Sequence, residues 1–175
     1  MRNTRYTKQQ IARFLPGHFT MSRGTVRDYD VLAAFHYLAP RPATLADIRV
    51  IRYRDGPRAK ARAVAVGVLS YPVPSSSGRE RYLHREQFTR AENLIFANRH
   101  IRTISRVIVH PQFRSLGLST LLVRCLCQHC KTRYVEAHAV MGALHPLFQR
   151  AGMQRVHLNG RNRPVYFILD RKEKR

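Results

Sequence analysis

Apolar residues recur along the chain with two periods, and each period predicts a different kind of element. Alternating or continuous apolar runs bounded by turn residues predict strands, whereas apolar residues three and four apart predict helices. The predicted strands are Phe19 to Ser22, Ile48 to Tyr53, Ala63 to Tyr71, Thr103 to Val109, Tyr134 to Val140, Val156 to Leu158 and Val165 to Leu169. The predicted helices are Val26 to Tyr37, a partial helix within 80–99, Leu118 to Lys131 and Pro146 to Ala151. This order indicates an α/β fold (α+β, with a mixed sheet).

The pattern also indicates one domain over residues 18–170. The turn signal Asp55-Gly56-Pro57 joins two predicted strands into a hairpin, and Asn159-Gly160 joins the last two. Residues 1–17 are interpreted as a basic extension with a short helix, and residues 171–175 as a charged tail. A chain of 175 residues is long enough for such a domain to bury a core.

The segment Ser105 to Gly117 carries the strongest local signal. A predicted strand ends at Pro111, a short basic turn follows, and Gly117 opens a helix. The start of a helix presents free backbone N–H groups and the positive end of the helix dipole, which together hold a phosphate or pyrophosphate. Glycine at that point costs helix stability relative to alanine, which indicates that the backbone itself is needed there.

Charge adds a candidate partner. The 32 Lys and Arg residues against 10 Asp and Glu give a formal net charge of +22 and a pI near 11.4. The positive electrostatic field of such a chain favours binding to a polyanion, either nucleic acid or an acidic surface. A solvated basic surface in an Arg-rich lineage would have the same composition. The apolar fraction of 44% is typical of a globular protein rather than a disordered one.

Several features bear on location. No run approaches the ~20 apolar residues of a membrane span, so no membrane association is predicted. The three cysteines favour a reducing compartment, and residues 1–20 lack the apolar core of a secretory signal, which predicts a cytoplasmic protein. Residues 1–27 contain no acidic residue, as in an organelle transit peptide or an arm that binds nucleic acid.

The hexapeptide from Arg114 to Ser119, Arg-Ser-Leu-Gly-Leu-Ser, resembles the cofactor signature of the GNAT superfamily of N-acetyltransferases. That signature is Arg or Gln, two residues, Gly, one residue, then Gly or Ala; Ser119 departs from it but stays small. The resemblance implies binding of acetyl-CoA or another acyl-CoA. It places the pantetheine along Val107, Ile108 and Val109, and Arg114 beside the pyrophosphate. The pyrophosphate itself would lie on the amides of Ser115, Leu116, Gly117, Leu118 and Ser119.

A narrower resemblance covers roughly residues 28–153. It rests on four segments: Phe35-His36-Tyr37, Gly67 to Pro72, Ile104 to Val107 and Val135 to Met141. These segments resemble those of one branch of the superfamily, which includes Mom-type phage DNA-modification proteins and GNAT-like domains fused to ABC-type ATPases. This implies acyl transfer to an amine of nucleic acid, with DNA favoured and RNA possible, and a duplex base would have to be flipped out. The alternatives are an RNA or ribosome-associated protein acetyltransferase, and a nucleic-acid-binding module without catalysis.

The candidate catalytic residues are His36, Tyr37, Ser105, Glu136 and His145. His36 and Tyr37 border the acceptor cleft that the resemblance implies, although His36 would also suit the negative end of a helix dipole. Ser105 is predicted to face the same side as Val107 and Val109, either touching the thioester or acceptor or lying as a buried, satisfied hydroxyl.

Glu136 lies in an apolar strand, where a carboxylate needs a partner. It is interpreted either as a base or base-orienting group for the attacking amine, or as half of a structural ion pair, with Arg106 one candidate partner. Many members of the superfamily carry a tyrosine acid in the helix that begins near His145, but Phe148 stands at that position here. His145 is therefore the substitute acid, or a simple helix cap.

Two further patterns have more than one explanation. Cys125, Cys127, His129 and Cys130 could suggest a metal, but a straight helix spreads them over two sides, so no metal is predicted. The basic stretches 49–62, 79–102 and 161–175 are interspersed in part with aromatic residues, which suits base stacking in a nucleic-acid groove or, equally, core packing.

Overall fold

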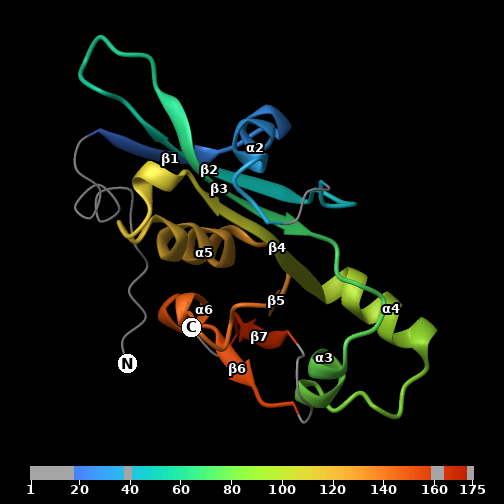
Figure 1. The fold of residues 1–175 in the computed structure, drawn as a ribbon. Coiled ribbons are helices and arrows are strands. Elements are labelled where there is room, and N and C mark those ends of the chain that lie inside the picture. The colour runs from blue at the N-terminus through green and yellow to red at the C-terminus, as the bar shows by residue number, and fades with distance from the viewer. Residues whose placement is uncertain (1–17, 38–40, 159–163, 173–175) are drawn as a thin grey trace.

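A computed structural model describes residues 18–37, 41–158 and 164–172 of the chain (Figure 1). The predicted extension 1–17 with its helix, the turn at Asn159-Gly160 and the last residues of the tail lie outside the described part. The described residues form one seven-stranded sheet in the order β1-β2-β3-β4-β5-β7-β6. Its strands are β1 (Phe19–Arg23), β2 (Asp47–Tyr53), β3 (Arg62–Ser70), β4 (Ile101–Val109), β5 (Tyr134–Ala139), β6 (Gln154–Val156) and β7 (Val165–Asp170).

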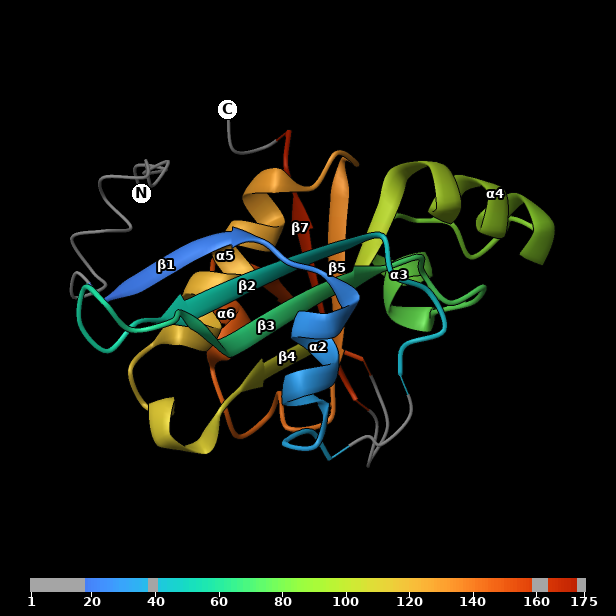
Figure 2. The same cartoon turned by 90° about the horizontal axis from the view of Figure 1, so that it is seen from above.

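Helices α2 (Val26–Ala33) and α5 (Leu118–His129) lie on opposite faces of the sheet (Figure 2). On one face Tyr29 and Leu32 of α2 pack against Val66, Val68 and Ile108. On the other face Leu118, Leu122, Val123 and Leu126 of α5 pack against the apolar residues of β2 to β5. The central strand β3 is thus covered on both faces, which explains its nearly continuous run of buried residues.

The first helix is shorter than predicted. A capping box between Thr25 and Asp28 starts α2, but it ends at Ala33 rather than at Tyr37. The amides of Phe35 and His36 bond to the carbonyls of Leu32 and Ala33, one residue closer than in an α-helix. The backbone therefore turns away after its last buried residue, and His36 and Tyr37 lie beyond the helix end.

Residues 71–100 form an insertion between β3 and β4 that contains two helices rather than one partial helix. These are α3 (Ser77–Tyr82) and α4 (Arg90–His100), and Thr89 and Glu92 form a capping box at the start of α4. The buried Asn93 accepts a hydrogen bond from Arg85 and donates to the carbonyls of Arg85 and Phe88, which closes the intervening turn. The insertion packs through α4 on β4 and through α3 on β7 (Figure 1).

The strands β4 and β5 run parallel and pair at only three positions, Ile101 with Tyr134, Arg102 with Val135 and Thr103 with Glu136. Beyond Thr103, β4 pairs with β3 alone while β5 pairs with β7, so one edge of β4 is left without a neighbouring strand. An opening in a sheet at such a divergence is a usual place for a ligand.

A β-bulge at this opening changes the predicted facing of Ser105. The register of β3 and β4 shifts so that Arg106 pairs with Val68 and Ile104 with Leu69, leaving Ser105 as the extra residue. Ile104 and Val107 consequently share the α5 side of the sheet. The prediction that Ser105 faces the same side as Val107 and Val109 is wrong, because it assumed unbroken alternation.

Candidate active site

A cleft of about 220 Å³ opens where β4 and β5 diverge. Its walls come from the segment after α2, the bulge of β4, the end of β5 and α6 (Leu147–Arg150). Four of the five predicted catalytic residues line it: His36, Tyr37, Ser105 and His145. Val107, predicted to contact the cofactor, lines it as well, so residues as far apart in the sequence as His36 and Phe148 meet at one opening.

The rings of His36 and Tyr37 form a flat surface at the mouth of the cleft. They are stacked with centroids 4.6 Å apart and an angle of 25° between their planes. The Tyr37 side chain is 67% exposed, so its outer face is open to a ligand. Stacked aromatic rings of this kind suit a planar partner.

Ser105 lies on the cleft wall with its hydroxyl already hydrogen-bonded. The Ser70 hydroxyl donates to the carbonyl of Thr44 at 2.6 Å, so the Ser105 hydroxyl, 2.7 Å from Ser70 Oγ, donates to it. The plainer reading of Ser105, a satisfied hydroxyl, is therefore correct as regards bonding, and the side chain is half-buried at the edge of the opening.

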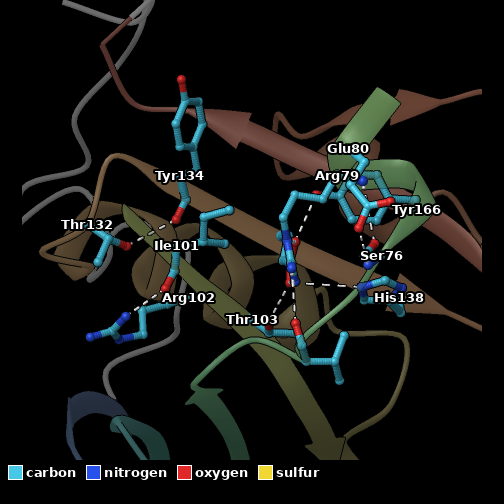
Figure 3. Close-up of polar contacts among 12 residues, drawn as sticks. Ser76, Arg79, Glu80, Ile101, Arg102, Thr103, Thr132, Tyr134, His138 and Tyr166 are labelled. Atoms are coloured by element: carbon cyan, nitrogen blue, oxygen red, sulfur yellow. Dashed lines mark hydrogen bonds and ion pairs between the residues drawn. The ribbon is translucent and has the colours of Figure 1, made fainter. Parts of the chain in front are cut away.

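Glu136 does not act as a base in this structure. Its carboxylate is fully buried and receives two hydrogen bonds from Arg79, Nη2 to Oε1 at 2.8 Å and Nε to Oε2 at 3.0 Å (Figure 3). The hydroxyls of Thr103 and Tyr166 donate to it at 2.7 and 2.8 Å. The structural ion pair is the correct interpretation, but its partner is Arg79 rather than Arg106.

Burial alone would raise the pKa of Glu136. The nearby His138 ring, the Arg79 guanidinium and the Thr103 hydroxyl outweigh this and lower that pKa to about 2. A carboxylate that stays ionised at all ordinary pH values cannot accept a proton from a substrate near neutrality. Burial and the adjacent carboxylate raise the pKa of Tyr166, so the Tyr166 hydroxyl keeps its proton and remains a donor.

Sequence reasoning missed Arg79 as a structural residue and counted it in the basic surface. It is only 2% exposed and lies 57 positions from its partner, in an insertion whose placement no local pattern predicts. It also missed His138 as a wall residue, although Glu136 and His138 share a face by strand period. His138 Nε2 lies 3.9 Å from Glu136 Oε1, and the ring lines the cleft.

The turn before α5 has the geometry predicted for a pyrophosphate. Ser115 and Gly117 have positive φ values of 66° and 76°, and α5 begins without a side-chain cap, so its first amides need an outside acceptor. A Cβ at Gly117 would meet nothing within 4 Å, which leaves room beside the backbone. Arg114, Ser115, Leu116 and Gly117 are all exposed around it, and Ser119 is half-buried.

Two of the predicted cofactor contacts cannot be made by side chains. Ile108 is buried against α2, on the opposite face of β4 from Val107 and Val109. Leu118 is buried in the cluster beneath α5. Only the backbone of these two residues is available to a ligand, because alternation in β4 and the apolar face of α5 direct both side chains inward.

The short helix α6 brings Phe148 to the cleft wall, where its ring lies 5.1 Å from that of Phe167. Phenylalanine carries no proton to give, so the expected tyrosine acid is absent from this position. His145 precedes the helix and lines the cleft, while the N-cap is Pro146 with no side-chain cap. The reading of His145 as a helix cap is therefore wrong, and its imidazole lies at the opening.

Among the described residues there is no group of three or more His, Cys, Asp or Glu side chains placed to hold a metal ion. All three cysteines are buried and none of them forms a disulfide, and burial raises the pKa of the Cys125 thiol to about 11. Within the described part of the chain no helix is both long and apolar enough to cross a bilayer.

The described carboxylates are largely matched one to one with arginines. Asp28, Asp30, Asp47 and Asp170 form ion pairs with Arg52, Arg41, Arg49 and Arg133 respectively. Arg85, predicted to join a polyanion groove, instead stacks over the rings of Phe88 and Phe96 at 4.0 and 4.3 Å. Arg81, Arg90 and Arg99 remain exposed on the insertion and carry part of the positive excess.

Neither a scan against models of protein families nor a search of curated proteins finds a match to this chain. Solved structures do match. NAA60 of Arabidopsis thaliana in complex with acetyl-CoA aligns with a TM-score of 0.61 at 12% identity, over 87% of this chain and 99% of that one. Aminoglycoside acetyltransferase AAC(6′)-Ib in complex with coenzyme A and kanamycin gives 0.54 at 14% identity, over 88% and 95%.

An agmatine N-acetyltransferase gives a TM-score of 0.53 at 14% identity, over 87% of this chain and 99% of that one. The chain has the acetyltransferase fold. The prediction of a mixed α/β domain of this kind is thereby confirmed, and the insertion carrying α3 and α4 lies within it between β3 and β4. In this acetyltransferase fold the cleft and the turn before α5 lie at the two ends of the open stretch of β4. The resemblance to the Mom-type branch stays a prediction.

Proposed function

We propose that the chain is an acyl-CoA-dependent N-acyltransferase whose acceptor is an amine of nucleic acid, most simply a DNA base as in Mom-type modification. The observation that carries the proposal is the order of three features along β4 and the turn that follows it. The cleft lies at Ser105, the stretch of β4 beyond Thr103 lacks a β5 partner, and the uncapped turn at Gly117 follows the strand. A pyrophosphate and a thioester at the two ends of an extended cofactor would need such an order.

The residues present fit acyl-CoA. The amides from Ser115 to Ser119 would hold the pyrophosphate, and the exposed Arg114 would balance part of its charge. The half-buried side chains of Val107 and Val109 lie on the α5 side of β4 and would contact the pantetheine. Acyl-CoA, when bound, supplies a thioester-activated acyl group at the cleft.

The chain's own residues then position an acceptor at the cleft. The stacked pair of His36 and Tyr37 gives a flat surface at the mouth of the cleft for the nucleic acid that carries the acceptor, and His145 is placed to return a proton to the leaving sulfur in place of the missing tyrosine. No Asp or Glu side chain occurs among the residues that line the cleft. Such a lining suits a neutral amine on a polyanion better than a cationic amine, and the net charge of +22 suits the same partner.

The test is a mass-spectrometric screen of the purified chain with acetyl-CoA and a panel of acceptors: single-stranded DNA, duplex DNA, RNA, a basic peptide and agmatine. The expected result is a mass increase on the DNA that depends on acetyl-CoA, larger for single strands because no base must be flipped. Acylation of RNA or of the basic peptide alone would replace the DNA acceptor by the corresponding alternative.

A second function is a nucleic-acid-binding module that has lost catalysis. Phe148 favours it, because the position of the expected proton donor holds a hydrocarbon ring. Binding of coenzyme A and DNA by the purified chain without acyl transfer under any condition of the screen would support this second function. Introducing the hydroxyl with Phe148→Tyr would then test whether the missing donor is the cause.

A further inference from the structure

A second cavity, of about 360 Å³, lies beside the cleft on the far side of His138. Its walls are the loop from Val73 to Gly78, which leads into α3, together with His138, Leu158, Pro164 and the ring of Tyr166. His138 is the one residue among the described ones that lines both cavities. The volume of this second cavity falls at the lower end of the ~300–1,000 Å³ range of small-molecule sites, which suits one ring system rather than an extended chain.

Residues 73–78 of the insertion form one wall of this cavity, and two residues, Gly78 and Arg79, hold the insertion in place. Gly78 lies directly on the Tyr166 ring, where a Cβ would come within 2.4 Å of Tyr166 Cγ. Arg79 reaches past it into the core, where it pairs with Glu136 and also donates to the carbonyl of Val73 at 3.0 Å (Figure 3). The loop of three serines, Ser75 to Ser77, is therefore fixed against His138 by a buried ion pair rather than by surface contacts.

We infer that the second cavity holds the acceptor as one uncharged, planar heteroaromatic amine, with its amine directed at His138. This inference rests on the proposed acyltransferase function and names the substrate class of that site. His138 lines both cavities, so an amine held against this side chain in the second cavity lies next to the cleft in which the thioester would sit. The ring of His138 packs edge-on to Tyr166 with centroids 5.1 Å apart, which orients it between the two spaces.

The chemistry of the walls selects the ligand. Among the described residues, the polar side chains that line the cavity and remain available are serine hydroxyls and one imidazole, which both donate and accept hydrogen bonds, as the edge of a heteroaromatic base does. No carboxylate lines either cavity in the described part of the chain. Behind the walls, Glu136 is paired with Arg79, and Glu80 accepts a hydrogen bond from the backbone amide of Ser76. A cationic amine would thus enter without a counter-charge, whereas a neutral base amine has no such need.

His138 also completes the proton balance. The amine nitrogen forms a bond to the acyl carbon, the bond from that carbon to sulfur breaks, and the sulfur leaves with the electron pair. The proton lost by the nitrogen passes to the His138 imidazole, which Glu136 stabilises as imidazolium across 3.9 Å. His145, on the opposite wall, gives a proton to the leaving sulfur. His138 is thus the proton acceptor that Glu136, bound by Arg79, cannot be.

The first test is equilibrium binding followed by NMR, with adenosine, cytidine and agmatine as probes. Neutral nucleosides should shift the His138 and Tyr166 ring signals, and agmatine should not. Ser75→Trp, which fills the cavity, and His138→Gln should each weaken nucleoside binding at least ~10-fold, whereas His129→Gln, at an exposed histidine of α5, should not change it. Nucleosides that do not bind, bind both variants equally, or bind no better than agmatine overturn the inference. Should Ser75→Trp not fold, His138→Gln decides alone.

The second test measures acyl transfer from acetyl-CoA to a single-stranded oligodeoxynucleotide. His138→Gln should lower kcat/KM by ~10²–10⁴-fold, the usual contribution of a general base, with coenzyme A affinity unchanged.

The two tests separate the inference from the proposed function. Transfer at an unchanged rate by His138→Gln overturns the inference and leaves the function standing. Nucleoside binding that depends on Ser75 and His138, without any transfer by the wild type, leaves the cavity assignment standing and overturns the acyltransferase function.

Discussion

Replacing Arg79 by methionine should lower the free energy of unfolding more than any substitution of an exposed residue in the same helix. Methionine keeps much of the length and volume of the arginine stem but removes both hydrogen bonds to Glu136 and the one to the Val73 carbonyl. It leaves a carboxylate at 0% exposure without its counter-charge. Breaking a buried pair in this way typically costs about 3–5 kcal/mol.

The pKa of Glu136 gives an independent magnitude. A fall from 4.5 to about 2 on folding is worth about 3 kcal/mol at 1.36 kcal/mol for each tenfold change. Because the folded pKa is the lower one, this stability is present above about pH 4.5 and is lost as the pH falls through about 2. Both estimates, from the broken ion pair and from the pKa of Glu136, are a large share of the free energy of unfolding of a typical domain, which is about 5–15 kcal/mol.

Urea unfolding at pH 7 and at about pH 4 would measure the effect. In the Arg79→Met variant, the burial of Glu136 should raise the pKa of its carboxyl group. The carboxyl then becomes neutral as the pH falls, and the variant regains stability relative to the wild type. The difference between the two proteins should be about 3–5 kcal/mol at pH 7 and clearly smaller at about pH 4. In the double variant Arg79→Met with Glu136→Gln, much of the loss should return, because no buried charge remains.

Arg81→Met is the matched control, since Arg81 is exposed in the same helix α3 and should change stability by no more than about 0.5 kcal/mol. Equal losses for the two single variants, or a loss for Arg79→Met that does not depend on pH, would refute the view that this ion pair anchors the insertion to the core.

Further predictions concern the ligands. Gly117→Glu should abolish coenzyme A binding in calorimetry while the fold is kept; Gly56→Glu, with a similar φ of 86° and equally open space, is its control and should bind normally. His36→Ala and Tyr37→Phe should lower turnover with coenzyme A affinity nearly unchanged, and equal rates would remove both from the site. Affinity for DNA should fall roughly 10³–10⁵-fold between 50 and 200 mM salt if six to ten phosphates are contacted. Changing the exposed Arg81, Arg90 and Arg99 to Gln should flatten that dependence, while changing them to Lys should not; a salt-insensitive affinity would exclude phosphate contacts.

Features that depend on neighbouring residues could be predicted well. The apolar runs of β3 and β5 and the helical spacing in α5 come from burial of the strands or of one helix stripe, which a short window of sequence already contains. The turn from Pro111 to Ser119 was predicted for the same reason, because glycine, small residues and a following helix are adjacent in the chain. The ends of elements were less accurate: α2 stops at Ala33 because its last buried contact is Leu32, which only packing reveals.

The sequence by itself thus determined the fold class, the glycine turn before α5 and four of the five candidate catalytic residues that line the cleft. Tertiary structure alone decided the rest, because those features depend on groups that lie far apart in the chain. From the sequence Glu136 is either a base or half of an ion pair with an unidentified partner. Only the fold brings Arg79, which lies 57 positions earlier, against it, and the energy of a buried charge depends on that partner. Likewise, a bulge of one residue re-aimed Ser105, and His138 became a shared wall only because β4 and β5 diverge after three pairs.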